Sequence, residues 1–167
     1  MMQIRGKAWK FGDDINTDLI IAGKYKLNIT DLDELSKHTM EVLMPDFAEK
    51  IEKGDLVVAG RNFGCGSSRE QAPVVLKHVG IGAVIAKSFA RIFYRNAINI
   101  GLPAVECADE DNIESGNFLE VDLKKGFISN RTKNKVYKVK TMPSELWMIL
   151  SEGGLVNYVK KFGKLPW

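Results

Sequence analysis

The sequence is poor in the residues that build disulfide frameworks and metal centres. Its 167 residues include two cysteines, Cys65 and Cys107, and two histidines, His38 and His78. Two cysteines cannot supply the set of bridges that holds small secreted domains together, so we expect a reducing, cytoplasmic compartment. No constellation of metal ligands is visible either, which makes an enzyme that works alone the weakest interpretation.

Long apolar runs are also missing. No stretch of about 18 or more apolar residues occurs, so we expect no transmembrane helix and no membrane partner. The first residues, MMQIRGKAWKFGDD, lack the apolar segment followed by small residues that is typical of a signal peptide. These features predict a soluble intracellular protein.

An excess of charge of one sign is lacking as well. The net charge is +3, from 24 Lys and Arg against 21 Asp and Glu, and the cations are scattered apart from Lys160, Lys161 and Lys164. No basic stripe is interleaved with aromatic residues, as a nucleic-acid groove requires. We therefore expect no nucleic-acid partner. The length and the 45% of apolar residues suffice for one core, so residues 1–167 are predicted to form a single domain.

The apolar periodicity predicts a mixed α/β fold. Strands are expected at 2–9, 56–60 and 83–89, and helices at 31–42, 69–80 and 90–101. The order strand, helix, strand, helix over 56–101 is typical of a parallel βαβ unit. Residues 104–141 alternate between turn signals, which indicates an antiparallel meander. The chain ends with two helical segments separated by Gly153 and Gly154.

The most informative segment is the glycine-rich turn GRNFGCGSSRE, residues 60–70, between a strand and a helix. Glycine lets backbone amides approach a ligand without a Cβ in the way. Ser67, Ser68 and Arg69 fall where the next helix is expected to begin. A helix N-terminus stabilises an anion, including a negatively charged serine oxygen. An arginine beside it can hold a carboxylate with two hydrogen bonds.

A purely structural interpretation is that Ser67 or Ser68 caps the helix, with Glu70 as its partner in a capping box. The turn is not a phosphate-binding P-loop, because no Gly-Lys-Ser/Thr follows, and G-x-G-x-x-G is absent. A Ser-His-Asp hydrolase is poorly supported, because His78 and His38 lie on predicted helices as packed or surface residues. The residues alone leave an anion site at a helix start.

Two long motifs add a family resemblance. The segments GRNFGCGSSREQAP and AVIAKSFARIFYRNAINIGLP resemble the swivelling domain of the aconitase superfamily. They are most similar to the free-standing small subunits of 3-isopropylmalate dehydratase, homoaconitase and 2,3-dimethylmalate dehydratase. FGDDINTDLIIAGKY and EGGLVNY resemble further signatures of these subunits. The resemblance covers most of 4–104 and the last helix, and it implies a β/β/α swivelling domain like the fourth domain of aconitase.

The resemblance also implies a reaction and roles for particular residues. The implied activity is that of a hydro-lyase subunit, which interconverts 2-isopropylmalate and 3-isopropylmalate in leucine biosynthesis by removing and re-adding water. Ser67 matches the general base, and its alkoxide form would be stabilised by the helix start and the glycine-rich amides. Ser68 and Arg69 match residues that bind the substrate carboxylate. Asp18 matches an active-site acid with Thr17 beside it, although a simple turn residue is the alternative for Asp18.

The family reaction needs a cofactor that this chain is not expected to bind. A four-iron, four-sulfur cluster acts as the Lewis acid and requires at least three cysteine thiolates. With two distant cysteines here, we expect the cluster on a large subunit and an active site formed between chains. Cys65 could lie near the site, but is more simply a small residue in a tight turn. In the isolated chain, an uncovered apolar face near the loops would favour homodimers or tetramers.

The resemblance points to residues 25–30 as the contact with the variable substituent of the substrate. Homoaconitases carry an arginine there for an extra carboxylate, whereas this sequence has Leu27 at that place. An unpaired carboxylate against an apolar side chain would cost roughly 2–7 kcal/mol, which favours isopropylmalate, then dimethylmalate, then homocitrate. Lys26 leaves a tricarboxylate substrate as an alternative, because a small shift of this segment would bring its ammonium to the extra carboxylate. In a different class of function, the turn holds a small anion or RNA phosphate without catalysis, which the near-neutral charge disfavours.

Overall fold

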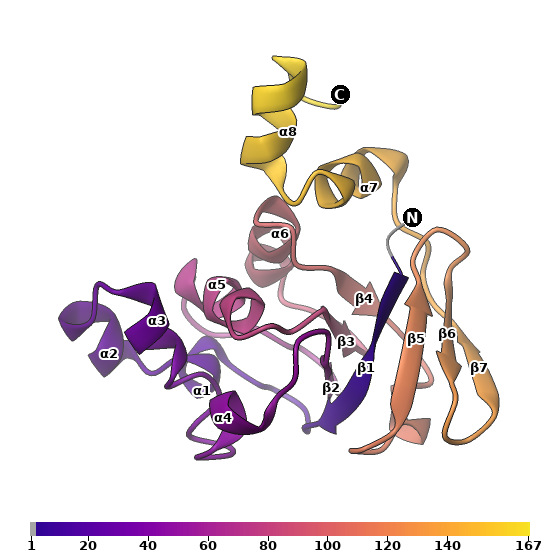
Figure 1. The fold of residues 1–167 in the computed structure, drawn as a ribbon, viewed down its shortest axis with the longest axis horizontal. Coiled ribbons are helices and arrows are strands. Elements are labelled where there is room, and N and C mark those ends of the chain that lie inside the picture. The colour runs from indigo at the N-terminus through magenta and orange to yellow at the C-terminus, as the bar shows by residue number, and fades with distance from the viewer. Residues whose placement is uncertain (1–2) are drawn as a thin grey trace.

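The computed structural model describes residues 3–167, which form a mixed α/β fold around one seven-stranded sheet in the order β4-β3-β2-β1-β5-β6-β7 (Figure 1). Met2, the first residue of the predicted strand 2–9, and Met1 lie outside the described residues. The strands are β1 Gln3–Lys10, β2 Leu56–Ala59, β3 Ala83–Ala86, β4 Ala104–Glu106, β5 Phe118–Asp122, β6 Phe127–Asn130 and β7 Lys135–Lys138.

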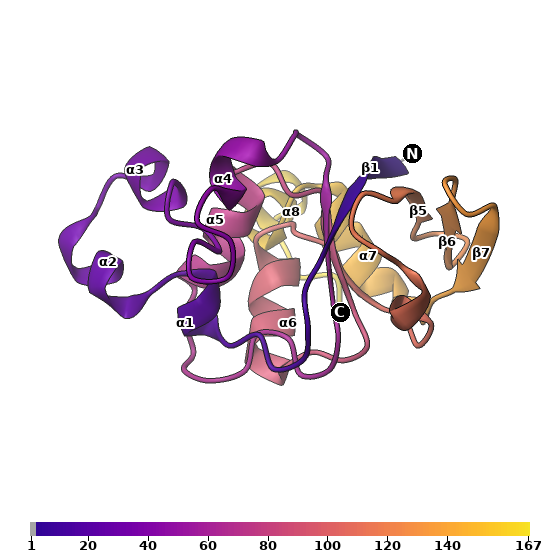
Figure 2. The same ribbon diagram turned by 90° about the horizontal axis from the view of Figure 1, so that it is seen from below.

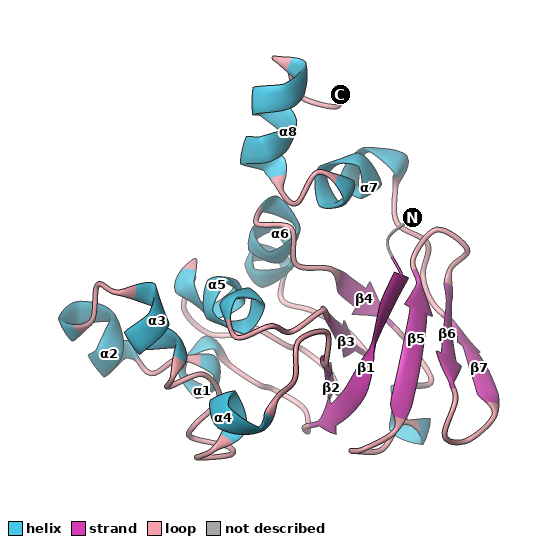
Figure 3. Cartoon of the chain, viewed as in Figure 1, coloured by secondary structure: helices cyan, strands magenta, loops and turns pink. Residues whose placement is uncertain are grey.

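The helices gather mainly on one side of the strands, as Figures 1 and 3 show. The α-helices of the described chain are α1 Thr17–Ile20, α2 Gly23–Asn28, α3 Leu32–Ser36, α4 Phe47–Lys50, α5 Gln71–His78, α6 Arg91–Asn99, α7 Ser144–Ser151 and α8 Leu155–Phe162, and a short 3₁₀ helix, η1, spans Glu110–Asn112. None of these helices combines the length and the apolar character needed to cross a bilayer within residues 3–167.

One half of the sheet is parallel. β1 pairs with β2, β2 with β3 and β3 with β4, all in parallel. Every side chain of β2 (LVVA) and β3 (AVIA) is buried, as expected for parallel strands covered on both faces. Helices α5 and α6 make the crossovers, which confirms the predicted βαβ pattern over 56–101.

The other half is an antiparallel meander of β5, β6 and β7, as the sequence predicted for 104–141. It joins the parallel half through β1, which pairs with β5 in antiparallel register, Arg5 opposite Glu120. The first strand of the chain therefore lies in the middle of the sheet. Figure 2 shows β1 between the helical side of the molecule and the meander.

Two hydrophobic clusters cover the two faces of the parallel strands. Val57 and Ala59 of β2 belong to the cluster with α1, α3, α4, α5 and α6. Leu56 and Val58 belong to the cluster with the β5–β7 meander and α7. The meander therefore curls over the second face, giving helix, parallel-sheet and antiparallel-sheet layers. This confirms the expected β/β/α architecture.

The region between β1 and β2 departs most from prediction. The helix expected at 31–42 ends at Ser36, and turns follow. The physical reason lies at Met40, which is fully buried, has φ +58° and donates its N–H to the Ile20 carbonyl at 2.8 Å. A continuous helix could not bring Met40 into that position. Residues 25–30, the segment expected to contact the substrate, lie partly in α2, and α4 was not predicted.

Candidate functional site

Three loops meet at the carboxyl ends of the parallel strands. The Gly60 N–H, after β2, donates to the Gly12 carbonyl after β1 at 3.0 Å, and the Lys87 N–H, after β3, donates to the Gly60 carbonyl at 3.0 Å. Ligand sites of open α/β sheets lie at this edge. The glycine-rich turn 60–70 is the middle one of the three loops.

Two glycines give the turn its shape. Gly64 and Gly66 have φ +80° and +88°, a region that side chains rarely adopt. A Cβ on Gly64 would lie 2.2 Å from Cγ of Phe93 on α6. The turn therefore packs directly against α6, and Cys65 between the two glycines accepts the Thr17 N–H at 2.9 Å.

A cavity of about 350 Å³ opens between this turn and α6. Its wall brings together four of the predicted site residues, Thr17, Ser67, Ser68 and Arg69. Ser67 and Ser68 are exposed. The Thr17 hydroxyl donates to the Ser67 carbonyl at 2.8 Å, which fixes the backbone of the serine relative to α1.

The helix predicted over 69–80, with Ser67 and Ser68 at its start, begins later than expected. Helix α5 begins at Gln71, its N-cap is Glu70, and no side chain in the described chain caps it. The capping-box interpretation of Ser67 or Ser68 with Glu70 is therefore also wrong. The reason is that the two positive-φ glycines keep the backbone in a turn up to the serines, so that regular helix forms only beyond them.

A different helix start faces the cavity. The N-cap and first turn of α6 line the same cavity, through Ala90, Arg91, Ile92 and Phe93. No side chain within residues 3–167 caps α6, and its first turn contains no acidic residue. The positive end of the α6 macrodipole therefore borders the cavity that the serines line.

Arg69 is held from within the molecule. Its Nη1 lies 2.5 Å from Oδ1 of Asp18 and donates to the Ile21 carbonyl at 3.0 Å. Asp18 Oδ1 also accepts the N–H of Gly23, the first residue of α2, at 3.3 Å. Arg69 is 16% exposed in its side chain against 58% for Asp18. The structure thus brings two of the predicted site residues together, although Asp18 does not itself line the cavity.

Lys26 and Leu27 do not line the cavity. Both are exposed on α2, with Leu27 at 85%. Their helix begins beside Arg69, because a Cβ on Gly23 would lie 2.9 Å from Arg69 Nη2. The Tyr25 ring of α2 stacks on the His38 ring, with 3.8 Å between the ring centroids, and this contact stabilises the position of the helix.

Neither histidine belongs to the cavity wall. His38 Nδ1 lies 2.7 Å from Glu41 Oε2, and His78 Nε2 lies 2.5 Å from Asp33 Oδ1. These surface contacts agree with the expectation that no histidine activates a serine here.

Cys65 lines the cavity as a half-buried thiol. Burial raises its pKa, and the negative charge of Asp14 adds to that effect, so the neutral thiol is favoured. Residues 3–167 contain no group of three or more His, Cys, Asp or Glu placed to hold a metal ion.

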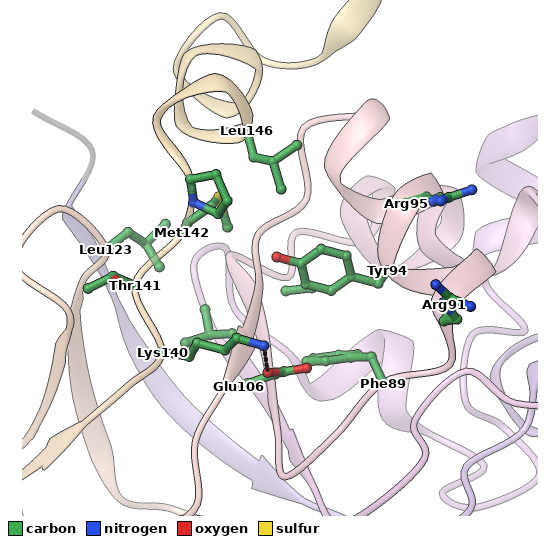
Figure 4. A pocket seen from close by; sticks show the side chains of 13 residues that line it. Phe89, Arg91, Tyr94, Arg95, Glu106, Leu123, Lys140, Thr141, Met142 and Leu146 are labelled. Carbon is green, nitrogen blue, oxygen red and sulfur yellow. Dashed lines mark hydrogen bonds and ion pairs between the residues drawn. The ribbon is translucent and has the colours of Figure 1, made fainter. Parts of the chain in front are cut away.

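A second cavity of about 330 Å³ lies on the other flank of α6, against β4 and the segment between β7 and α7 (Figure 4). It contains the Glu106–Lys140 ion pair at 3.0 Å, and burial raises the pKa of the Tyr94 hydroxyl there. None of the predicted site residues lines it.

The α6 wall was missed from the sequence. Arg91, Ile92, Phe93 and Asn96 line the cavity, although 90–101 was correctly predicted to be a helix. The available signal was topological. A helix that follows a parallel strand begins at the same sheet edge as the turn after the neighbouring strand.

The comparisons with known proteins agree with this geometry. Residues 14–110 match the aconitase C-terminal domain family. The chain is 60% identical over 155 residues to 3-isopropylmalate dehydratase small subunit 1 of Archaeoglobus fulgidus, covering 93% of this chain and 96% of the relative. It is 52% identical over 163 residues to small subunit 1 of Thermotoga maritima, covering 98% of each.

A solved structure is equally similar. The crystal structure of 3-isopropylmalate dehydratase from Methanocaldococcus jannaschii superposes with a TM-score of 0.92 at 52% sequence identity, covering 97% of this chain and 96% of that one. The chain described here therefore belongs to the aconitase C-terminal domain family, among relatives that are 3-isopropylmalate dehydratase small subunits.

Proposed function

We propose that this chain is the small subunit of a 3-isopropylmalate dehydratase, which interconverts 2-isopropylmalate and 3-isopropylmalate by removing and re-adding water. Relatives of that name match almost the whole of both chains at 52–60% identity. We further propose that residues 1–167 act as one swivelling domain in the cytoplasm and pair with a large subunit. The observation that carries the proposal is the exposed Ser67 in a cavity shared with Arg69.

Ser67 is proposed as the general base. A serine hydroxyl becomes a base only where its alkoxide is stabilised. The first turn of α6 lines the same cavity and supplies the positive end of a helix. The hydrogen bond from the Thr17 hydroxyl to the Ser67 carbonyl fixes the serine backbone at the cavity.

Ser68 and Arg69 are proposed to bind one substrate carboxylate. Arg69 is already oriented by Asp18 and the Ile21 carbonyl, so little side-chain freedom is lost when the substrate binds. Asp18 then acts by keeping the guanidinium in place at the cavity wall.

When bound to the large subunit, a four-iron, four-sulfur cluster would supply Lewis-acid chemistry at the substrate hydroxyl. Placing it on the partner follows from the thiols of this chain. Cys107 is buried, burial raises the pKa of Cys65, and two thiols are too few for such a cluster.

Leu27 and Lys26 are proposed to contact the variable substituent once the large subunit closes over α2. The Leu27 side chain is 85% exposed. An apolar side chain at this place favours contact with an isopropyl group over contact with an unpaired carboxylate. The reconstituted pair should therefore turn over isopropylmalate in preference to dimethylmalate and homoaconitate. Turnover of the tricarboxylate alone would reverse this ranking.

The test of the function is reconstitution with the large subunit. We expect the small subunit alone to be inactive, the pair to be active, and Ser67→Ala in the pair to lower kcat by about 10²–10⁴-fold. Ser129→Ala on β6, away from the cavity, is the matched control and should leave kcat unchanged. Circular dichroism should show an unchanged fold in both variants.

Full activity of the Ser67→Ala pair would refute the base assignment. A wild-type pair that turns over none of the three acids would refute the proposed function.

A further inference from the structure

The second cavity, on the flank of α6 next to β4, has the composition of a small-molecule site. Its volume is about 330 Å³. Sites for small ligands usually measure roughly 300–1,000 Å³ and combine an apolar lining with a few polar groups. Here Val105, Leu123, Met142 and Leu146 contribute to the apolar lining, and the first two are buried. An apolar group of a ligand would be removed from water against these side chains.

An ion pair lies within this apolar lining. Lys140 Nζ is 3.0 Å from Glu106 Oε2, and Figure 4 shows the two side chains meeting in the cavity. The backbone fixes the pair as well, because the Lys140 N–H donates to the Glu106 carbonyl at 3.2 Å. The Glu106 side chain is 33% exposed and the Lys140 side chain is 75% exposed. A ligand can therefore reach both charges.

The Tyr94 hydroxyl adds a third polar group. In Figure 4 it points into the cavity, toward the side formed by Met142, and makes no hydrogen bond with the other lining residues drawn there. Burial raises the pKa of this hydroxyl, and the negative charge of Glu106 adds to the effect. The hydroxyl therefore keeps its proton and can donate it in a hydrogen bond to an anionic oxygen.

The opposite charges of Glu106 and Lys140 decide which ligand fits between them. A ligand with one charge would pair with one of the two side chains and separate it from the other. A ligand that carries both charges provides a new partner for each. Arg91 and Arg95, which could attract a simple anion, lie at the margin of the cavity in Figure 4, away from the ion pair.

We infer that the second cavity binds an apolar α-amino acid in its zwitterionic form. The ammonium of the ligand lies against the Glu106 carboxylate, and its carboxylate lies against the Lys140 ammonium and the Tyr94 hydroxyl. Its side chain packs against Met142 and Leu146. Such a ligand is not a hydroxy diacid, so this binding site goes beyond the proposed function.

Isothermal titration calorimetry of the full chain tests the class of ligand with L-leucine, N-acetyl-L-leucine and L-leucinamide. The three share one apolar side chain, but the acetylated compound lacks the ammonium and the amide lacks the carboxylate. We expect leucine to bind, and the other two to bind at least about tenfold more weakly, because each loses one charge-assisted contact. Equal affinity for N-acetyl-L-leucine would indicate a simple anion site and would overturn the inference. So would the absence of measurable leucine binding.

Variants connect the binding to the cavity. Glu106→Gln and Lys140→Gln should each raise Kd for leucine at least about tenfold, and Tyr94→Phe should raise it about 3- to 10-fold. Glu152→Gln is the matched control, because Glu152 pairs with Lys161 at 2.7 Å, is 25% exposed and lines neither of the two cavities. It should leave Kd within about twofold of wild type.

Thermal unfolding should show that these variants keep the fold. Equal Kd values for the Glu106→Gln and Glu152→Gln chains would place the binding elsewhere and overturn the assignment. The same titration into the pair reconstituted with the large subunit should give an unchanged Kd. Loss of leucine binding in the pair would show that the large subunit covers the cavity, which would also overturn a ligand site there.

Discussion

Asp18 Oδ1 and Arg69 Nη1 lie 2.5 Å apart, and this contact joins helix α1 to the turn after β2. Both residues come from segments far apart in the sequence. The contact holds the guanidinium at the cavity wall even without substrate, which makes Asp18 a positioning residue whose loss should affect the site more than the fold.

Asp18→Asn should lower kcat/KM for isopropylmalate by about tenfold, because one charge-assisted hydrogen bond to Arg69 becomes a neutral one. The melting temperature should hardly change, since Asp18 is 58% exposed. Steady-state kinetics of the reconstituted pair and thermal unfolding measure the two effects. Asp33→Asn, which removes a surface carboxylate paired with His78, is the control. Equal kinetic losses in both variants would contradict the positioning role.

Gly64→Ala should destabilise the protein much more than Gly116→Ala. Both glycines have a positive φ, +80° and +87°, so each substitution carries a backbone penalty of about 1–2 kcal/mol. Only the Gly64 variant adds a clash, because its Cβ would lie 2.2 Å from Phe93 Cγ whereas nothing lies within 4 Å of a Cβ at Gly116. Differential scanning calorimetry compares the two. Equal melting temperatures would show that the turn does not pack tightly on α6.

Glu110→Gln should destabilise the fold by about 1–3 kcal/mol, because the buried carboxylate loses charge-assisted contacts to two partly exposed lysines. The Glu110 carboxylate is 3% exposed and pairs with the Lys10 ammonium. The Lys87 ammonium lies 3.8 Å from its other oxygen. Glu114→Gln breaks a pair with Lys133 at 3.1 Å but at 70% exposure, and should cost less than about 1 kcal/mol. Urea unfolding gives both values, and a loss for Glu110→Gln no larger than the control would argue against the buried network.

Both thiols should react slowly with iodoacetamide at pH 8. Burial raises the pKa of Cys65 and of Cys107, so less thiolate is present than in an unfolded chain. We expect half-buried Cys65 to be alkylated first and fully buried Cys107 only on unfolding, as followed by mass spectrometry. Faster labelling of Cys107 than of Cys65 in the folded protein would contradict the burial.

The same shifts link stability to pH. Because the folded state favours the protonated thiols, their contribution is complete below the pKa of an unfolded cysteine, about 8.5. It is lost as the pH rises through the higher folded values.

The layered architecture could be predicted because its signals are local. The buried runs of β2 and β3 and the alternation in β5 to β7 each identify an element within a few residues. The glycine-rich turn likewise pointed to Ser67 and Arg69. The structure places both residues at one cavity, because they lie close together in the same turn.

What remained hidden depends on contacts between distant segments. The end of the helix at Ser36 follows from Met40 packing beneath Ile20, which no periodicity reports. The wall containing Arg91 becomes part of the cavity only when β3 lies next to β2. The sequence indicated that Gly64 is needed for its backbone freedom. Its close approach to Phe93, which leaves no room for a Cβ, could not be predicted from the sequence.

The central place of β1 has a consequence for synthesis on the ribosome. β1 pairs with β2 along one edge and with β5 along the other, and no other strand of the described chain joins the two halves of the sheet. In the nascent chain β1 can pair with β2 early. Its other edge stays unpaired until β5 is synthesised, because Arg5 lies opposite Glu120. Until then an unpaired strand edge is open to other nascent chains. Translation arrested before β5 therefore yields an aggregation-prone fragment, not a smaller stable domain.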